Sequence, residues 1–206
     1  MKMKTLAFRI FLAGVVVSMA GIAQAQMVGL PVMDTASPRD KGNLEVTPGA
    51  MFGRDMDFYG VRTTLSLADD FRAFLDLGQV DLVDGDSNFG VQAGGLYSLE
   101  PTELGDLGIR GAAYYSKTDR LGLTGANGML VFSDETLLDH LFFYGGIGLD
   151  IVYKSMDNPG GESTTQAEIN PALSLGLSFQ FSENFSLFVE GDYIDGPYVG
   201  AGLSIR

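Results

Sequence analysis

The chain contains no cysteine and no tryptophan, and it has one histidine among its 206 residues. Without cysteine there are no disulfides, no thiolate nucleophiles and no cysteine metal sites. The single histidine, His140, closes a turn that begins at Ser133, and a structural role in that turn is expected. A nucleophile activated by histidine needs an ordered group of partners that this sequence does not offer. We therefore expect no enzyme activity and no catalytic residue.

Basic residues are also scarce, with 13 Lys and Arg against 26 Asp and Glu and a net charge of −13. Nucleic-acid binding needs clustered Lys and Arg and is not expected. Two acidic pairs, Asp55 with Asp57 and Asp84 with Asp86, lack the further ligands and closing Glu of a calcium loop. They are interpreted as solvated turn residues, so neither a metal nor a cofactor is predicted.

Long apolar runs are absent except for Ile10 to Ala20 near the start of the chain. Three basic residues precede this run, and Ala23-Gln24-Ala25 follows it. This is the pattern of an export signal, so residues 1–25 are predicted to be removed after Ala25. The run is shorter than the ~20 residues that a spanning helix needs. The remaining chain would carry 10 basic and 26 acidic residues, a net charge of −16.

What the chain has in abundance is alternation of apolar with polar or small residues. It is most regular in Ala167–Ser182, where every second residue from Ala167 to Phe181 is apolar. Such alternation gives a strand one apolar face, here called the oily face, and one polar face, here called the wet face. Ten segments are predicted to be strands, and most have the 9–13 residues that suit a tilted membrane crossing. They are residues 43–53, 57–68, 71–82, 89–99, 107–116, 122–132, 141–153, 167–181, 185–193 and 198–205.

The alternation fits either a soluble barrel with an apolar interior or a membrane barrel with an apolar exterior. The wet faces are rich in Gly, Ala and Ser, which suits a narrow lumen better than a solvated surface. With the N-terminus in the periplasm, aromatic residues of the oily faces fall near the strand ends, as in the girdles of membrane barrels. The outer girdle would be Phe52, Tyr59, Phe89, Tyr115, Tyr153 and Tyr193, and the inner one Phe71, Tyr97, Phe181 and Phe185. In the same orientation the longest mid-chain connection, residues 154–166, is an extracellular loop.

Residues 26–42 have no periodicity and contain two prolines, so they are predicted to form an irregular leader before the barrel of residues 43–206. The leader either plugs the barrel or forms a loose tail, and a loose tail is the favoured interpretation. No other segment resembles a linker, so a single all-β domain is expected.

The signal sequence, the two-faced strands and the last strand together resemble the small outer-membrane β-barrel proteins, the OmpA-like and opacity-type barrels. The last strand is similar to the C-terminal signal that the barrel-assembly machinery reads, carried here by Tyr198, Gly200, Leu203 and Ile205. Family members usually end in an aromatic residue, whereas this chain ends in Ile205-Arg206. The resemblance implies an antiparallel up-and-down transmembrane barrel, with ten strands counted here and eight in the best-known members.

Charged residues on the wet faces are the candidate site. A small barrel holds side chains inside, and buried charges need partners, so a lumen network of salt bridges is predicted. Its members are Glu45, Arg62, Arg72, Asp76, Arg110, Asp150, Glu168, Glu190 and Asp192. The expected role is structural or one of surface interaction in the bacterial outer membrane, with lipid and the assembly machinery as partners and any surface ligand unknown. A narrow channel for ions or small solutes is the alternative, followed by a soluble periplasmic barrel that binds an apolar ligand.

Overall fold

The computed structural model describes residues 28–30, 32, 34–83, 85–103, 105–117, 121–136, 138–157, 163–194 and 196–206. The predicted export signal lies outside the described residues. Within the described residues no helix is long and apolar enough to cross a membrane.

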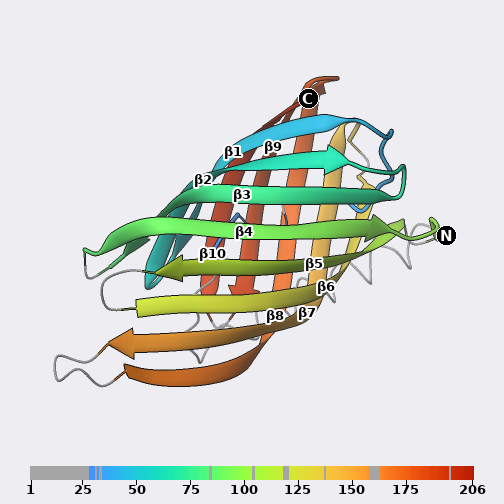
Figure 1. Cartoon of the computed structure of the whole chain (residues 1–206). Helices are drawn as coiled ribbons and strands as arrows, with labels where there is room; N and C mark the ends of the chain where they lie inside the picture. The colour runs from blue at the N-terminus through green and yellow to red at the C-terminus, as the bar shows by residue number, and fades with distance from the viewer. Residues whose placement is uncertain are drawn as a thin grey trace.

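The described chain forms one closed antiparallel barrel of ten strands, in which each strand pairs with its sequence neighbours and β1 pairs with β10. This confirms the all-β barrel and the count of ten. The front strands cross the rear strands at a steep angle, as in a barrel with strongly tilted strands (Figure 1). The strands are β1 (Leu44–Gly53), β2 (Met56–Ser66), β3 (Phe71–Leu82), β4 (Ser87–Ser98), β5 (Asp106–Lys117), β6 (Leu121–Glu135), β7 (Leu141–Asp157), β8 (Ser163–Ser182), β9 (Phe185–Ile194) and β10 (Pro197–Ile205).

The barrel has two distinct ends. We call the end with the β1–β2, β3–β4, β5–β6, β7–β8 and β9–β10 connections the loop end. We call the opposite end, where β1 begins and β10 finishes, the terminal end. At the terminal end His140 has a left-handed backbone with φ 66°, and its carbonyl accepts a hydrogen bond from the Gln180 N–H at 2.9 Å.

The longest mid-chain connection is shorter than the sequence suggested. Residues 154–166 were expected to be loop, but β7 continues to Asp157 and β8 begins at Ser163. The two strands pair as far as Asp157 and Ser163, while β8 pairs with β9 only from Ala172 onward. The β7–β8 hairpin therefore extends beyond its β9 neighbour at the loop end. Its polar residues do not alternate with apolar ones, so periodicity did not reveal the strands there.

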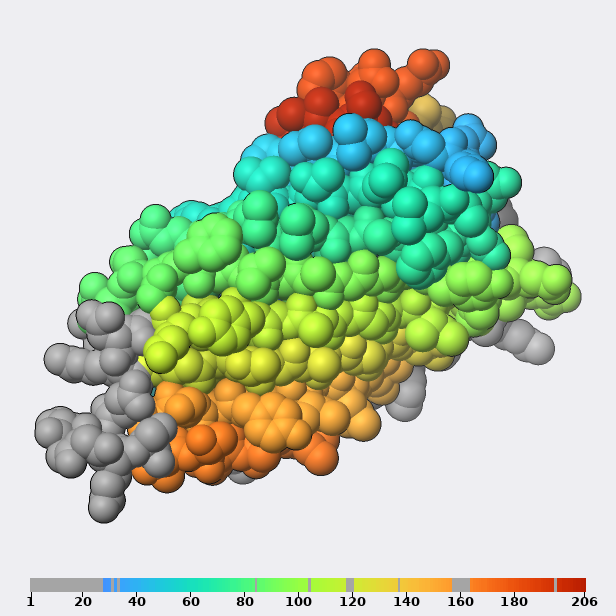
Figure 2. Space-filling model, viewed as in Figure 1, coloured from blue at the N-terminus to red at the C-terminus, as the bar shows by residue number. Residues whose placement is uncertain are grey.

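The wall has an apolar exterior and a polar interior. Ile147 and Leu149 on β7 point outward and are about 60% exposed, whereas Asp150 between Leu149 and Ile151 is 1% exposed. On the face seen in Figure 2 the side chains of neighbouring strands form an unbroken wall. The outer positions of the strands are apolar along the wall, whereas the inner positions carry polar residues together with apolar ones.

The leader lies inside the barrel, and the expectation of a loose tail was wrong. Val28, Leu30 and Ala36 are fully buried, and Val32 is nearly so. The leader enters β1 through Gly42, whose φ of 86° is a conformation that glycine adopts without strain. Periodicity could not reveal this placement, because an irregular segment that fills a lumen has no repeating partner.

Candidate functional site

The structure places eight of the nine predicted lumen charges inside the barrel. Each of the eight is at most 6% exposed: Glu45, Arg62, Arg72, Asp76, Arg110, Asp150, Glu190 and Asp192. The ninth, Glu168, is half-buried on the hairpin near the loop end, where its carboxylate accepts a hydrogen bond from Lys154 Nζ at 2.7 Å. The nine residues therefore do not form one cluster, because Glu168 is set apart from the rest.

Arg62 on β2 is the centre of the buried network. Its Nε donates to Asp76 Oδ1 at 2.7 Å, and its Nη2 donates to Asp76 Oδ2 at 2.8 Å. Two further hydrogen bonds of the guanidinium reach the leader, with Nη1 donating to the Val32 carbonyl and Nη2 to the Leu30 carbonyl, both at 2.7 Å. A bidentate pair with a carboxylate is the strongest arrangement available to arginine. Arg62 thus joins wall and leader in one charged unit.

The wall also accepts hydrogen bonds from the leader backbone. The Leu30 N–H donates to Asp76 Oδ2, and the Val32 N–H donates to Glu190 Oε1, both at 2.9 Å. Nearer the terminal end the Ala36 N–H donates to Ser133 Oγ at 2.9 Å. Buried backbone groups need such partners, and here charged wall residues supply several of them. The sequence predicted that these charged residues form salt bridges with each other, and it did not reveal their hydrogen bonds to the leader.

A second charged group lies at the terminal end. Arg39 of the leader hydrogen-bonds to Asp34 at 2.6 Å and to Glu45 of β1. Arg206 reaches the same Glu45 carboxylate at 3.2 Å, and Arg72 lies 3.5 Å from Asp34. Burial acts to raise the pKa of Asp34, but the guanidiniums of Arg39 and Arg72 outweigh it and hold that pKa below its ordinary value. Burial likewise acts to lower the pKa of Arg39, and Asp34 with Glu45 outweighs it.

Arg110 is held differently from Arg62, although both cover one aromatic ring. The two guanidiniums lie 4.6 and 4.7 Å from the centroid of the Phe74 ring. Arg110 donates to the neutral side chains of Asn127 at 2.8 Å and Gln92 at 3.2 Å. Phe74 is an aromatic residue on the otherwise polar face of its strand. Its contact with the two guanidiniums explains why an aromatic ring stands there.

Toward the loop end, apolar side chains gather in the lumen beside the buried Asp192 and Ser116. These apolar side chains come from strand positions close to the loop-end turns, point inward and are at most 3% exposed. They belong to one continuous core cluster that also contains Val28 of the leader. We call this set the apolar collar: Met51, Met56, Phe58, Val80, Leu123, Val152, Ile194 and Tyr198. Sequence reasoning missed the collar, although the signal was present as apolar residues on the wet-face positions of these strands.

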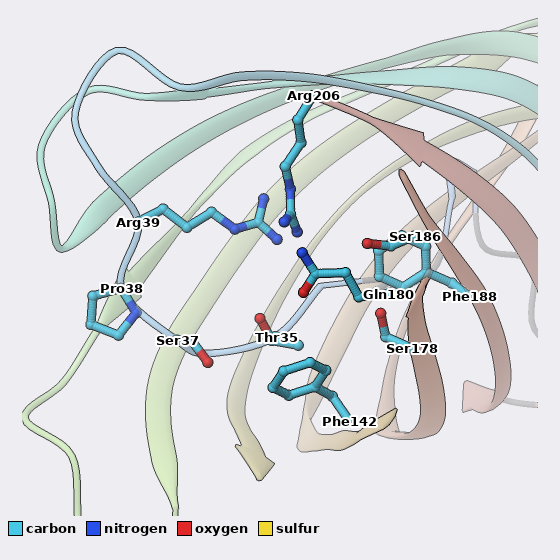
Figure 3. Close-up of a pocket in the computed structure, with 10 residues that line it drawn as sticks. All are labelled: Thr35, Ser37, Pro38, Arg39, Phe142, Ser178, Gln180, Ser186, Phe188 and Arg206. Carbon is cyan, nitrogen blue, oxygen red and sulfur yellow. The ribbon is translucent and has the colours of Figure 1, made fainter. Parts of the chain in front are cut away.

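A cavity of about 170 Å³ opens beside the leader at the terminal end. Arg39 and Arg206 lie on one side of it, while Phe142 and Phe188 lie on another, with Gln180 between the two groups (Figure 3). Both arginines are already bound to Glu45, so the cavity has polar edges without a free charge pair.

Nine of the ten predicted girdle residues stand on the outer surface, from 36% exposed at Phe71 to 57% at Phe89. Tyr193 is the correction, because its ring is only 9% exposed. It lies where β9 turns directly into β10, with Leu173 and Pro197 as its cross-strand neighbours. Of the assembly-signal residues, Ile205 points outward, whereas Tyr198 is 3% exposed in the collar.

No protein-family model matches the chain, and no curated protein matches it. Solved structures of barrels are similar to it at low identity. The N-terminal β-barrel domain of Pseudomonas aeruginosa OprF is 17% identical with a TM-score of 0.40, over 81% of this chain and 98% of that one. Neisserial surface protein A is 14% identical with a TM-score of 0.44, over 79% and 96%. A loop-deletion mutant of OmpT, an outer membrane protein of Vibrio cholerae, is 12% identical with a TM-score of 0.36, over 77% and 62%.

Proposed function

We propose that this protein is an integral outer-membrane barrel of the bacterial envelope, closed at rest, with a structural or surface-interaction role. The observation that carries the proposal is the inverted distribution of side chains. Leucine, isoleucine and phenylalanine cover the outside, while eight charged residues are buried inside. Such an apolar exterior is stable in contact with lipid and unfavourable in contact with water. A soluble barrel that binds an apolar ligand would need the reverse arrangement.

Two features support a closed lumen over the alternative of a narrow channel. The leader occupies the charged part of the lumen and hydrogen-bonds to Arg62, Asp76 and Glu190. The apolar collar fills the part near the loop end, and hydrophobic constrictions of this kind exclude water and ions. The charges of the lumen then serve to hold the leader and to satisfy one another.

The β7–β8 hairpin supports the surface-interaction part of the proposal. With the terminal end in the periplasm, this hairpin projects on the extracellular side beyond β9. Its two strands remain paired as far as Asp157 and Ser163, which gives partners a strand surface beyond the rest of the wall near β9. Any partner that binds there remains to be identified, and lipid is the partner proposed for the wall.

Gel mobility of the membrane fraction, with and without boiling, tests the membrane barrel. A closed barrel has no free strand edges and resists SDS until it is heated, so a heat-dependent shift is expected. A protein that is soluble without detergent and shows no shift contradicts the proposal.

Planar-bilayer recordings of the purified full-length mature protein test the closed resting state. We expect no steady conductance. Steady current that is abolished by charge reversal at Arg62 or Arg110 would instead establish the channel. The two experiments are independent, because a barrel can pass the gel test whether or not it conducts.

A further inference from the structure

The leader is held in the lumen mainly through its backbone. Wall side chains bond to the N–H groups of Leu30, Val32 and Ala36 and to the carbonyls of Leu30, Val32 and Thr35. These backbone bonds would form with many peptides, whereas the buried Val28, Leu30 and Val32 side chains and the Arg39–Glu45 pair are particular to this segment. The described residues of the leader have no strand pairing in the barrel and belong to no sheet.

The wall is hollowed along the path of the leader. A Cβ added at Gly90 would lie 2.7 Å from Val28 Cγ1, and one at Gly49 would lie 3.2 Å from Leu30 Cδ2. Both distances are closer than carbon atoms pack, so the leader fits only because these wall positions lack a side chain. The path runs from Val28, which packs in the core cluster with the collar, to Arg39 at the terminal end. Without the leader this path would be empty, and the collar would lose the packing of Val28.

The charges along this path favour one sign of ion. With the leader gone, the buried wall charges are five carboxylates and three guanidiniums. The carboxylates are Glu45, Asp76, Asp150, Glu190 and Asp192, and the guanidiniums are Arg62, Arg72 and Arg110. Rings of carboxylates select cations in channels. Departure of the leader would also expose Asp76 and Glu190, because each accepts a backbone N–H from it.

We infer that residues 28–39 are a removable plug and that the barrel behind them is a latent pore that prefers cations. The inference rests on the proposed membrane barrel and goes beyond its closed resting state. The described leader runs into the wall through Gly42, where an added Cβ would meet nothing within 4 Å. Its exit is therefore toward the terminal end.

The first test expels the leader from the full-length mature protein by replacing Leu30→Asp together with Val32→Asp. The new carboxylates would be buried beside Asp76 and Glu190, so repulsion and desolvation favour release of the leader. In planar bilayers we expect a mean current at least about tenfold above wild type, with K⁺ more permeant than Cl⁻. Pro38→Asp, on an exposed part of the same leader, is the matched control and is expected to carry no more current than wild type.

A synthetic peptide of residues 28–42 gives the pore a second signature. Added to the open variant, it is expected to block the current from one side of the bilayer only, because the lumen admits the leader from the terminal end. A peptide of scrambled sequence is expected to leave the current unchanged. Block from both sides, or equal block by the scrambled peptide, overturns the assignment of the leader as the plug.

A disulfide lock tests the same inference without expelling the leader. A Cβ at Gly108 would lie 3.5 Å from the Cβ of Ala36, within the usual range of about 3.5–4.5 Å for a disulfide. The chain has no other cysteine, so Ala36→Cys with Gly108→Cys forms the only thiol pair. We expect brief openings in the reduced protein that disappear on oxidation and return on reduction. The single Ala36→Cys protein, treated with the same oxidant, is expected to keep its openings.

The outcomes separate the inference from the proposed function. A protein without a heat-dependent gel shift contradicts the membrane barrel itself. If the aspartate variant keeps the gel shift but is silent, or if the reduced cysteine pair never opens, the latent pore is wrong and the closed membrane barrel stands.

Discussion

The two parts of the lumen are both fully buried and are stabilised in opposite ways. In the apolar collar, the side chains of Met51, Phe58 and Val152 fill space and form no hydrogen bonds. In the charged part, Arg62 is bonded to Asp76, and Arg62, Asp76 and Glu190 are each bonded to the leader, at 2.7 to 2.9 Å. A collar residue stabilises the fold by filling volume in the lumen. A charged residue stabilises the fold by pairing with an opposite charge that would otherwise be buried alone. Burial by itself therefore does not tell how much a lumen residue matters.

The largest effect is expected at Asp76. In Asp76→Ala the Arg62 guanidinium loses its carboxylate, and the Leu30 N–H loses its acceptor. Removing one partner of a buried pair costs roughly 3–5 kcal/mol of unfolding free energy. Urea titration of the protein in lipid vesicles measures this loss, with Asp40→Ala at the exposed terminal end as the control. A change at Asp76 no larger than that at Asp40 would mean that the pair is not buried from water.

A slightly smaller effect is expected in the collar. Phe58→Ala removes a ring that packs over positions 60, 78 and 90, all glycines, which have no side chains to fill the space. Cavities of this kind cost about 3 kcal/mol. The same titration measures it, and Phe58→Leu is expected to cost less than half as much. Equal costs for the two variants would show that the collar is loosely packed.

The two arginines that cover Phe74 provide the sharpest contrast. Arg110→Met is expected to change the unfolding free energy by only about 1 kcal/mol, because its hydrogen bonds go to neutral side chains and methionine packs against the same ring. Arg62→Met leaves Asp76 uncompensated and is expected to cost several times more. Parallel titrations of the two variants compare them directly. A reversed order would place the main electrostatic partner of the acidic residues at Arg110.

The smallest effect is expected at Asp34, on the leader. Its pKa is held below the ordinary value, so its stabilising contribution is complete at neutral pH and is lost as the pH falls through that lowered pKa. Asp34→Asn is expected to cost about 1 kcal/mol at pH 7 and almost nothing once the pH is well below the lowered pKa of Asp34. Unfolding titrations at the two pH values measure the difference. A cost that persists at the lower pH would assign the effect to packing of the leader.

Much of the wall could be predicted from the sequence. All ten strands were located, and Phe71–Leu82 has the predicted bounds. Alternation also placed Asp150 inside and Ile151 outside, because a strand presents successive residues to opposite faces. The predicted strand bounds and side-chain directions were wrong where apolar and polar positions do not alternate in the structure, as in the extended hairpin after Tyr153 and at the buried Tyr193.

The candidate site could be predicted only in part. The buried charges were found from their positions on the wet faces, but their partners were not. Arg62 bonds to leader residues some 30 positions away, and Glu190 bonds to one 158 positions away. Asp34, Arg39 and Arg206 were missed because none of them lies on a periodic strand. The collar was missed because small polar residues were expected along the whole lumen.

The sequence by itself determined the barrel wall: which residues form strands, which face of each strand meets lipid, and which charges turn inward. It could do so because the period of two is a local property that every strand carries in its own residues. Only the tertiary structure decided what fills the lumen, namely the leader in its charged part and the collar near the loop end. The physical reason is that the leader has no period of its own, and its backbone is satisfied by side chains that closure of the barrel brings together from distant strands.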